Sequence, residues 1–165
     1  MTQIILRVWL KIPDAEASTV RNTLVRRMGL QGILIDVKKE RLFSIDVEGG
    51  NPLDLAKSFA KELVNENKES CKILFDEVKF EGDYVPVKVG LHIEDGEAIS
   101  TRERLRNRLG FKNVTDVKKA TIWKLYIAGD KPEKVAKEIA EWLLINPHKD
   151  SYEVLEKTKK LPECR

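Results

Sequence analysis

Asp36-Val37-Lys38-Lys39 recurs unchanged as Asp116-Val117-Lys118-Lys119, 80 positions later in the chain. Toward the N-terminus the offset becomes 81 and aligns a run of identities: Leu10/Leu91, Ile12/Ile93, Asp14/Asp95, Ala17/Ala98, Arg21/Arg102, Leu24/Leu105, Arg27/Arg108 and Gly29/Gly110. Toward the C-terminus the offset stays at 80 and aligns Gly49/Gly129, Pro52/Pro132, Ala56/Ala136, Ala60/Ala140 and Leu63/Leu143. Because one single-residue gap accommodates all of these matches, the sequence predicts a tandem repeat with units at residues 1–80 and 81–165.

Both units show the same order of periodic segments. Residues 4–12 and 87–93 alternate in the way that is typical of a half-buried strand. Residues 15–28 and 97–109 then carry apolar side chains at helical spacing, each followed by a glycine suited to a left-handed helix cap. The remaining predicted segments are two strands (33–38 and 41–48, matched by 114–118 and 121–128), a helix that starts at Pro52 or Pro132, and a last strand (72–80, matched by 151–155).

This order predicts an α+β fold. It consists of two tandem ferredoxin-like βαββαβ units, each an antiparallel sheet with its helices on one face. The connection at residues 81–84 is short, so the two units should pack against each other. The polar tail, residues 157–165, is expected to fray.

The sheet face without helices is expected to carry a contact surface. It would present Trp9 and Tyr126 beside Leu42 and Ile122, and exposed tryptophan next to other apolar groups usually marks an interface. We expect this contact to form between the two sheets or between chains. The alternative is that Trp9 only covers its neighbours at a sheet edge.

Charged positions that recur in both units are further candidates. Arg21 and Arg102 lie one turn from core positions of the first helix and have no acidic residue at salt-bridge spacing. The lysine pairs are expected beside a hairpin, where lysine also serves to guard a sheet edge. The partner-contact candidates are Trp9, Arg21, Arg102, Lys38, Lys39, Lys118, Lys119 and Tyr126.

Composition weakens several classes of function. Lys and Arg number 30 against 27 Asp and Glu, and the net charge of +3 is a weak indication of nucleic-acid binding. No apolar run reaches the roughly 18–20 residues of a membrane span, and no signal peptide is recognisable. Two cysteines 93 positions apart, Cys71 and Cys164, fit a reducing cytoplasm without a disulfide framework.

No recognisable catalytic motif is present in the sequence. It contains neither a glycine-rich phosphate loop nor a nucleophile elbow. His92 and His148 stand alone, one in a predicted strand and one beside Pro147 in a predicted turn. We therefore expect no catalytic residue, cofactor or metal, and interpret the chain as a binding protein.

Four stretches of the second unit resemble a known family. They are Val87-Lys88-Val89-Gly90-Leu91, Asp95-Gly96-Glu97-Ala98, Leu109-Gly110-Phe111, and Asn146-Pro147 followed shortly by Tyr152. These motifs resemble the PurS family, the small subunit of phosphoribosylformylglycinamidine synthase in de novo purine synthesis. The resemblance covers residues 85–156 and extends more weakly, through the repeat, to residues 4–78.

The resemblance implies a non-catalytic subunit of an ATP-dependent, glutamine-using ligase complex. PurS-like subunits associate with a glutaminase subunit and a large synthetase subunit, help to dock the two, and support ammonia transfer between them. A duplicated unit resembles a fused homodimer, so a homo-oligomer such as a dimer of chains is also expected.

Two other functions are kept as alternatives. One is a regulatory module that binds an amino acid with its paired ferredoxin-like units. The other is RNA binding on the open sheet, with Trp9 and Tyr126 as stacking residues.

Overall fold

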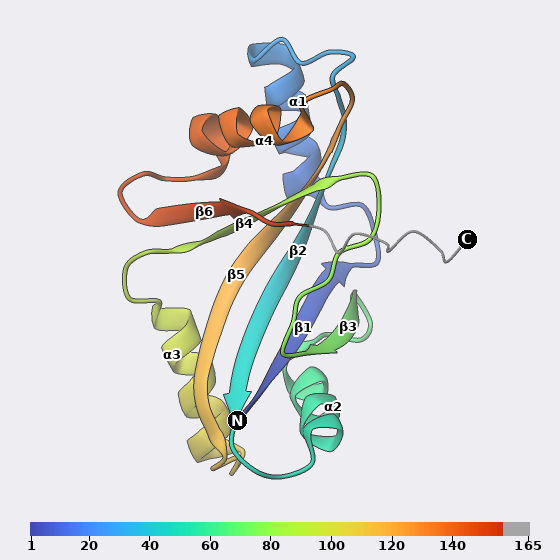
Figure 1. The fold of residues 1–165 in the computed structure, drawn as a ribbon. Coiled ribbons are helices and arrows are strands. Elements are labelled where there is room, and N and C mark those ends of the chain that lie inside the picture. The colour runs from blue at the N-terminus through green and yellow to red at the C-terminus, as the bar shows by residue number, and fades with distance from the viewer. Residues whose placement is uncertain (157–165) are drawn as a thin grey trace, which may run out of the picture.

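The computed structural model describes residues 1–156, so the predicted fraying of residues 157–165 lies outside the described part of the chain. The elements follow in the order β1 (Thr2–Leu10), α1 (Ala15–Arg27), β2 (Leu34–Val47), α2 (Pro52–Leu63), β3 (Glu69–Phe75), β4 (Val85–Leu91), α3 (Gly96–Glu103), β5 (Val114–Ile127), α4 (Pro132–Ile139) and β6 (Asp150–Val154) (Figure 1). Wider π-helical turns continue α3 over Arg104–Arg108 and α4 over Ala140–Leu144.

The predicted hairpin at residues 38–41, and its counterpart at 118–121, is wrong. β2 and β5 are single strands of 14 residues that run straight through these positions. Neither stretch contains the Gly, Asn or Pro that a tight turn requires, so the alternating pattern continues unbroken. Each half therefore contributes three strands in place of four. The α+β class is confirmed, whereas two ferredoxin-like units are not.

All six strands form one antiparallel sheet in the order β3-β1-β2-β5-β4-β6. The two long strands pair at its centre and run side by side through the molecule (Figure 1). Arg41 of β2 lies opposite Thr121 of β5, and these two positions correspond to each other at the offset of 80. From the centre outward, the first half contributes β2, β1 and β3, and the second half contributes the corresponding strands β5, β4 and β6. A local twofold axis therefore passes near the pair of Arg41 and Thr121.

Local sequence fixes the ends of the helices. The carboxylates of Asp14 and Asp95 accept hydrogen bonds from the first backbone N–H groups of α1 and α3, and Asn51 does the same for α2. Gly29 and Gly110 adopt φ angles of 66° and 78° beyond the helix ends, as the sequence predicts. Pro52 and Pro132 open α2 and α4.

The four helices cover one face of the sheet, which we call the helix face. Val37, Phe43 and Ile45 point from β2 toward this face and pack in its cores. One core lies between the sheet and the pair formed by α2 and the π-helical turn that continues α3. The other core lies between the sheet and the pair formed by α1 and α4. Each helix pair thus combines one helix from each half of the chain (Figure 1). This exchange ties the two halves together.

The opposite face, which we call the open face, is crossed by the connection between the halves. We call residues 76–84 the strap. Phe80 and Tyr84 of the strap are 1% and 3% exposed and pack on Ile5, Leu42 and Ile122 of the sheet. The predicted last strand of the first unit therefore ends early, at Phe75, and Phe80 belongs to the strap.

Candidate partner interface

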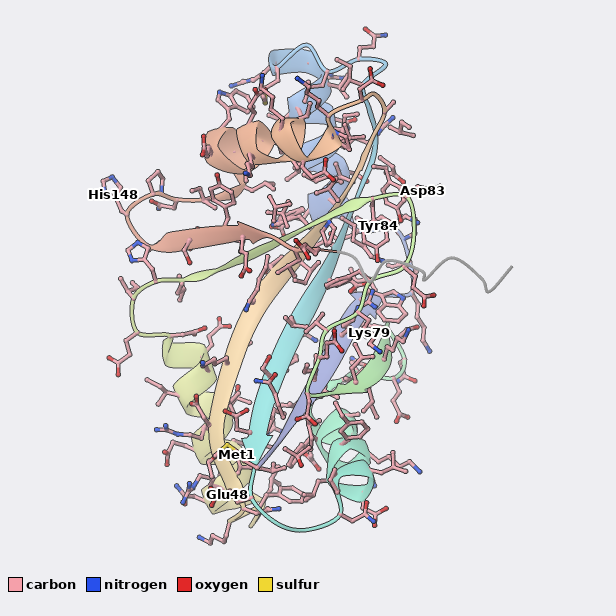
Figure 2. All side chains as sticks on the ribbon, viewed as in Figure 1. Met1, Glu48, Lys79, Asp83, Tyr84 and His148 are labelled. Atoms are coloured by element: carbon pink, nitrogen blue, oxygen red, sulfur yellow. The ribbon has the colours of Figure 1, made fainter. Side chains whose placement is uncertain are left out.

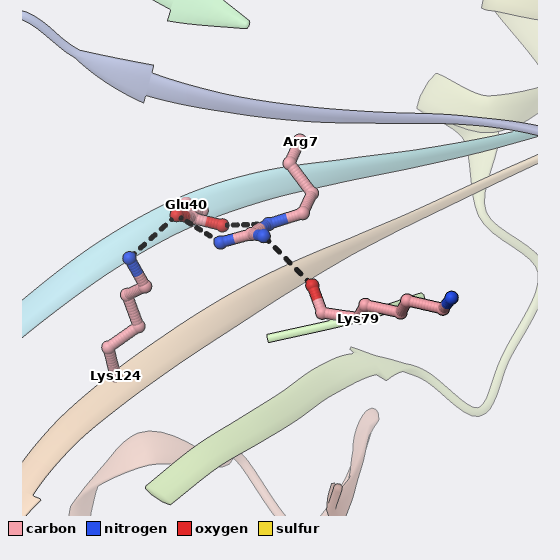
Figure 3. Close-up of polar contacts among 4 residues, drawn as sticks. All are labelled: Arg7, Glu40, Lys79 and Lys124. Atoms are coloured by element: carbon pink, nitrogen blue, oxygen red, sulfur yellow. Dashed lines mark hydrogen bonds and ion pairs between the residues drawn. The ribbon is translucent and has the colours of Figure 1, made fainter. Parts of the chain in front are cut away.

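A buried ion cluster holds the strap on the open face (Figure 3). The Arg7 guanidinium donates to both carboxylate oxygens of Glu40, from Nε at 2.8 Å and from Nη2 at 2.9 Å. Lys124 Nζ lies 2.9 Å from Glu40 Oε1 and closes the cluster from β5. Arg7 Nη1 also donates to the backbone carbonyl of Lys79, at 2.9 Å. The cluster therefore links β1, β2, β5 and the strap.

Burial and charge act in opposite directions on the pKa of Glu40. Burial by itself raises the pKa, because it penalises the charged form, but hydrogen bonds and charge from Arg7 and Lys124 outweigh it and lower the pKa below its ordinary value. Glu40 is 3% exposed and Arg7 is 6% exposed, so neither group is compensated by water. The strap adds ring faces to both cations: Arg7 Cζ lies 4.5 Å from the Phe80 centroid and Lys124 Nζ lies 4.7 Å from the Tyr84 centroid.

The sequence predictions did not include this cluster. Arg7 and Glu40 alternate with apolar residues along their strands, and charged residues in such a pattern usually face water. Their pairing depends on the strap and on the β2–β5 contact, neither of which local periodicity reveals.

Four of the predicted contact residues lie on the open face. Trp9 is half-buried and follows Arg7 on β1. The ring of Tyr126 packs 5.4 Å from that of Tyr84, and Lys38 Nζ lies 5.4 Å from the Tyr126 centroid. Lys118 lies on β5 and borders a hollow beside the strap. Part of the expected surface is therefore covered by the strap, which packs on Leu42 and Ile122.

The other two lysines lie on the helix face. Lys39 Nζ contacts the Glu16 carboxylate, and Lys119 Nζ contacts the Glu97 carboxylate at 2.7 Å. Glu16 and Glu97 correspond at the offset of 81, so this ion pair occurs in both halves. Neighbouring lysines of each pair therefore point to opposite faces, as consecutive residues of a strand do.

The two arginine candidates have different environments. Arg21 Nε donates to the carbonyl of Ile35 at 3.2 Å and so closes the edge of β2. Arg102 instead forms an ion pair with Glu103 at 3.6 Å. As expected, neither arginine has an acidic residue three or four positions away along its helix. The partner of Arg102 is the adjacent residue, Glu103.

The open face is hollowed beside the strap. A cavity of about 710 Å³ lies between Phe80 of the strap, β5 and the end of β6. Lys88 and Lys118 border it and form no ion pair among the described residues. Five acidic residues also border it. Asp95 caps α3 and Asp116 accepts from the backbone N–H of Val117. The other three form no ion pair among the described residues: Glu94, Glu153 and Glu156. The cavity is therefore a mixed polar and apolar surface.

The histidine and cysteine side chains of residues 1–156 lie apart from the strap or are shielded. No group of three His, Cys, Asp or Glu side chains in this range could hold a metal ion. His148 stands at the tip of the loop before β6, far from the strap (Figure 2). Burial, and secondarily the charge of Glu69, raises the pKa of the Cys71 thiol, which disfavours its reactive thiolate form. The part of the chain described by the structure offers surfaces for binding.

Comparison with known proteins finds one family model that is similar to the second half of the chain. Residues 84–157 match the family model PurS, described as phosphoribosylformylglycinamidine (FGAM) synthase. This match confirms the resemblance for the second half of the chain and connects that half with FGAM synthase. No curated protein matches the chain significantly.

Among residues 1–156, no helix combines the length and the apolar character that a transmembrane span needs.

Proposed function

We propose that this chain is the small, non-catalytic subunit of cytoplasmic FGAM synthase, which bridges the glutaminase and synthetase subunits and supports ammonia transfer between them. The observation that carries the proposal is the PurS match over residues 84–157. A shared sheet supports it, because two halves joined through the 14-residue strands β2 and β5 make a rigid body that could hold two partners in a fixed relation.

The first half, in this proposal, is a second PurS-like unit that arose by tandem duplication. Its elements follow in the same order as those of the second half, and the ion pair between Lys39 and Glu16 has its counterpart in Lys119 and Glu97. The arrangement about a local axis is that of a symmetric dimer whose two copies have become one chain. A dimer of such chains remains a prediction.

Reconstitution tests the proposed function. The glutaminase and synthetase subunits are assayed for FGAM formation with ATP, once with glutamine and once with ammonium chloride, with and without this chain. We expect the chain to be required with glutamine and to matter much less with ammonium chloride, because free ammonia bypasses transfer between subunits. Equal glutamine-dependent rates without the chain would contradict the proposal.

A further inference from the structure

β3 forms one edge of the six-stranded sheet, and among the described residues no strand pairs with its outer side (Figure 1). Open edges are usually protected by charged side chains, proline, bulges or a covering segment, because their unpaired backbone groups bind other chains. The protection of β3 is slight. After Glu69 the strand carries one charged residue, Lys72, and its last residue, Phe75, is 39% exposed.

Hydrogen bonds to β1 show which backbone groups of β3 point outward. At one end, the N–H of Asp76 donates to the carbonyl of Gln3 at 2.8 Å. At the other end, the N–H of Lys11 donates to the carbonyl of Lys68 at 2.9 Å. Along an antiparallel ladder, hydrogen-bonded pairs alternate with pairs that are not hydrogen-bonded. After Glu69, the residues whose N–H and carbonyl groups point away from β1 are therefore Cys71, Ile73 and Phe75.

The same three residues form an apolar row on the helix face. Cys71 and Ile73 pack against the core under α2, and strand alternation places Phe75 on the same side. The N–H of Glu77 donates to the Phe75 carbonyl in the turn that follows, at 2.7 Å. The other outward backbone groups of this row form no hydrogen bond among the described residues. The edge therefore suits a strand that has unpaired backbone groups and an apolar row of its own.

β3 of a second copy is such a strand. An antiparallel pair about a twofold axis at Ile73 places each Ile73 opposite its copy and each Cys71 opposite a Phe75. On the open face it places Lys72 opposite Leu74. An axis at Lys72 would place two lysines opposite each other, which is destabilising. An axis at Cys71 would leave Phe75 opposite residue 67, outside the partner strand. The axis at Ile73 is therefore the favoured register.

Carboxylates protect the other edge of the sheet, at β6. Asp150 and Glu153 lie on this strand, and Glu156 follows it at the position that corresponds to Phe75. Pairing between copies is therefore favoured at β3 and opposed at β6. A twofold contact uses the same surface of both copies, so the assembly closes at two chains.

We propose that two copies of this chain associate through β3, in antiparallel register about Ile73, and join their sheets into one. The contact repeats between chains the twofold strand pairing that joins the two halves at β2 and β5. It pairs the outward backbone groups of Cys71 and Ile73 and covers the exposed ring of Phe75. It gives a surface for the dimer of chains that the sequence predicts. No synthase subunit is required, so the inference does not depend on the proposed function.

Sedimentation velocity over a range of concentrations tests the association. Phe75→Lys adds a cation to the apolar row at a side chain that is already partly exposed. Trp142→Lys is the matched control, since Trp142 is 48% exposed on the turn that continues α4, in the other half of the chain. Circular dichroism verifies that both variants are folded.

We expect the unmodified chain to dimerise. The dissociation constant of the dimer should rise at least about tenfold in Phe75→Lys and stay unchanged in Trp142→Lys. A chain that is monomeric at every concentration would overturn the inference, and so would equal weakening by the two variants.

Disulfide cross-linking tests the register. In a Cys71→Ser/Cys164→Ser background, oxidation of Ile73→Cys should give a linked dimer. The reason is that a hydrogen-bonded antiparallel pair has Cα atoms about 5.5 Å apart, within the roughly 4.4–6.8 Å that a disulfide spans. Lys72→Cys is the control, because its position faces Leu74 of the second copy. Linkage through Lys72→Cys without linkage through Ile73→Cys would overturn the register and the inference with it.

Binding to the purified glutaminase and synthetase subunits separates this inference from the proposed function. If the unmodified chain is monomeric and Phe75→Lys abolishes its binding to one of these subunits, the edge receives a strand of that subunit; the inference is then overturned and the proposed function stands. Dimerisation through β3 without binding of either subunit supports the inference and contradicts the proposed function.

Discussion

Replacement of Glu40 by methionine tests whether the ion cluster secures the sheet and the strap. Glu40→Met keeps the volume of the side chain but leaves the Arg7 guanidinium, 6% exposed, without its carboxylate. Removal of one partner from a buried pair costs about 3–5 kcal/mol. Small domains are stable by roughly 5–15 kcal/mol, so the loss is a large share of the total. At about 2–4 °C per kcal/mol, the melting temperature should fall by on the order of 10 °C.

The double variant Arg7→Met/Glu40→Met separates loss of charge pairing from loss of packing. With both buried charges replaced by apolar groups, most of the stability should return, because desolvation of the pair offsets much of its attraction. The Lys124 side chain, 16% exposed, then has to find water instead of Glu40. Glu97→Gln is the control for an exposed pair, because the Glu97 side chain is 82% exposed and its ion pair should contribute no more than about 1 kcal/mol.

Urea unfolding of these variants, followed by circular dichroism, gives the free energies, and limited trypsin digestion reports on the strap. Arg7 holds the strap through the Lys79 carbonyl, so cleavage after Lys79 should be faster in Glu40→Met than in the unmodified chain. The reasoning is refuted if Glu40→Met costs no more than Glu97→Gln. It is also refuted if the double variant is less stable than Glu40→Met.

Three further predictions concern acid stability, helix capping and glycine conformation. The pKa of Glu40 in the folded chain lies below its ordinary value of 4.5, so its contribution to the free energy of unfolding is complete above pH 4.5 and is lost as the pH falls through the folded-state pKa. In acid titrations, Arg7→Met/Glu40→Met should therefore lose less stability than the unmodified chain. Asp95→Ala should cost about 1 kcal/mol in urea unfolding, and Asp95→Asn, which still caps α3, should cost less. Gly110→Ala, at a φ of 78°, should destabilise by about 1 kcal/mol, whereas Gly96→Ala, at a helical position, should leave stability unchanged or raise it; equal effects would contradict the conformational argument.

The helix ends could be predicted because their causes are local. Asp14, Asn51 and Asp95 each lie just before a helix, and their side chains bond to backbone groups two and three residues away. The glycines after α1 and α3 are equally local, since only the residue's own φ angle is involved. Gly29 and Gly110 were predicted at these positions, whereas the capping roles of Asp14 and Asp95 were not.

The predicted hairpins were wrong although the local sequence favours one continuous strand. The residues from Asp36 to Phe43 alternate without a turn residue, and that pattern favours one continuous strand. The prediction of two strands, 33–38 and 41–48, divided this segment where no turn residue supports a division. The consequence was large, because a continuous β2 can pair along its whole length with β5, whereas a hairpin could not.

The side of the sheet was predicted for part of the candidate surface. Trp9, Lys38, Lys118 and Tyr126 do lie on the open face, as the alternation of strand residues indicates. Their surroundings were not foreseen, because the strap covers the centre of that face and leaves the hollow beside it.

Sequence alone determined where the helices begin and which glycines follow α1 and α3, since these features depend on residues close together in the chain. The repeat was predicted by direct comparison of letters. Only the tertiary structure decided that the halves share one sheet, that helices pair across the halves, and that Arg7, Glu40 and Lys124 meet beneath the strap. Those contacts join residues far apart in sequence. Their energy depends on simultaneous burial of both partners, which no local pattern encodes.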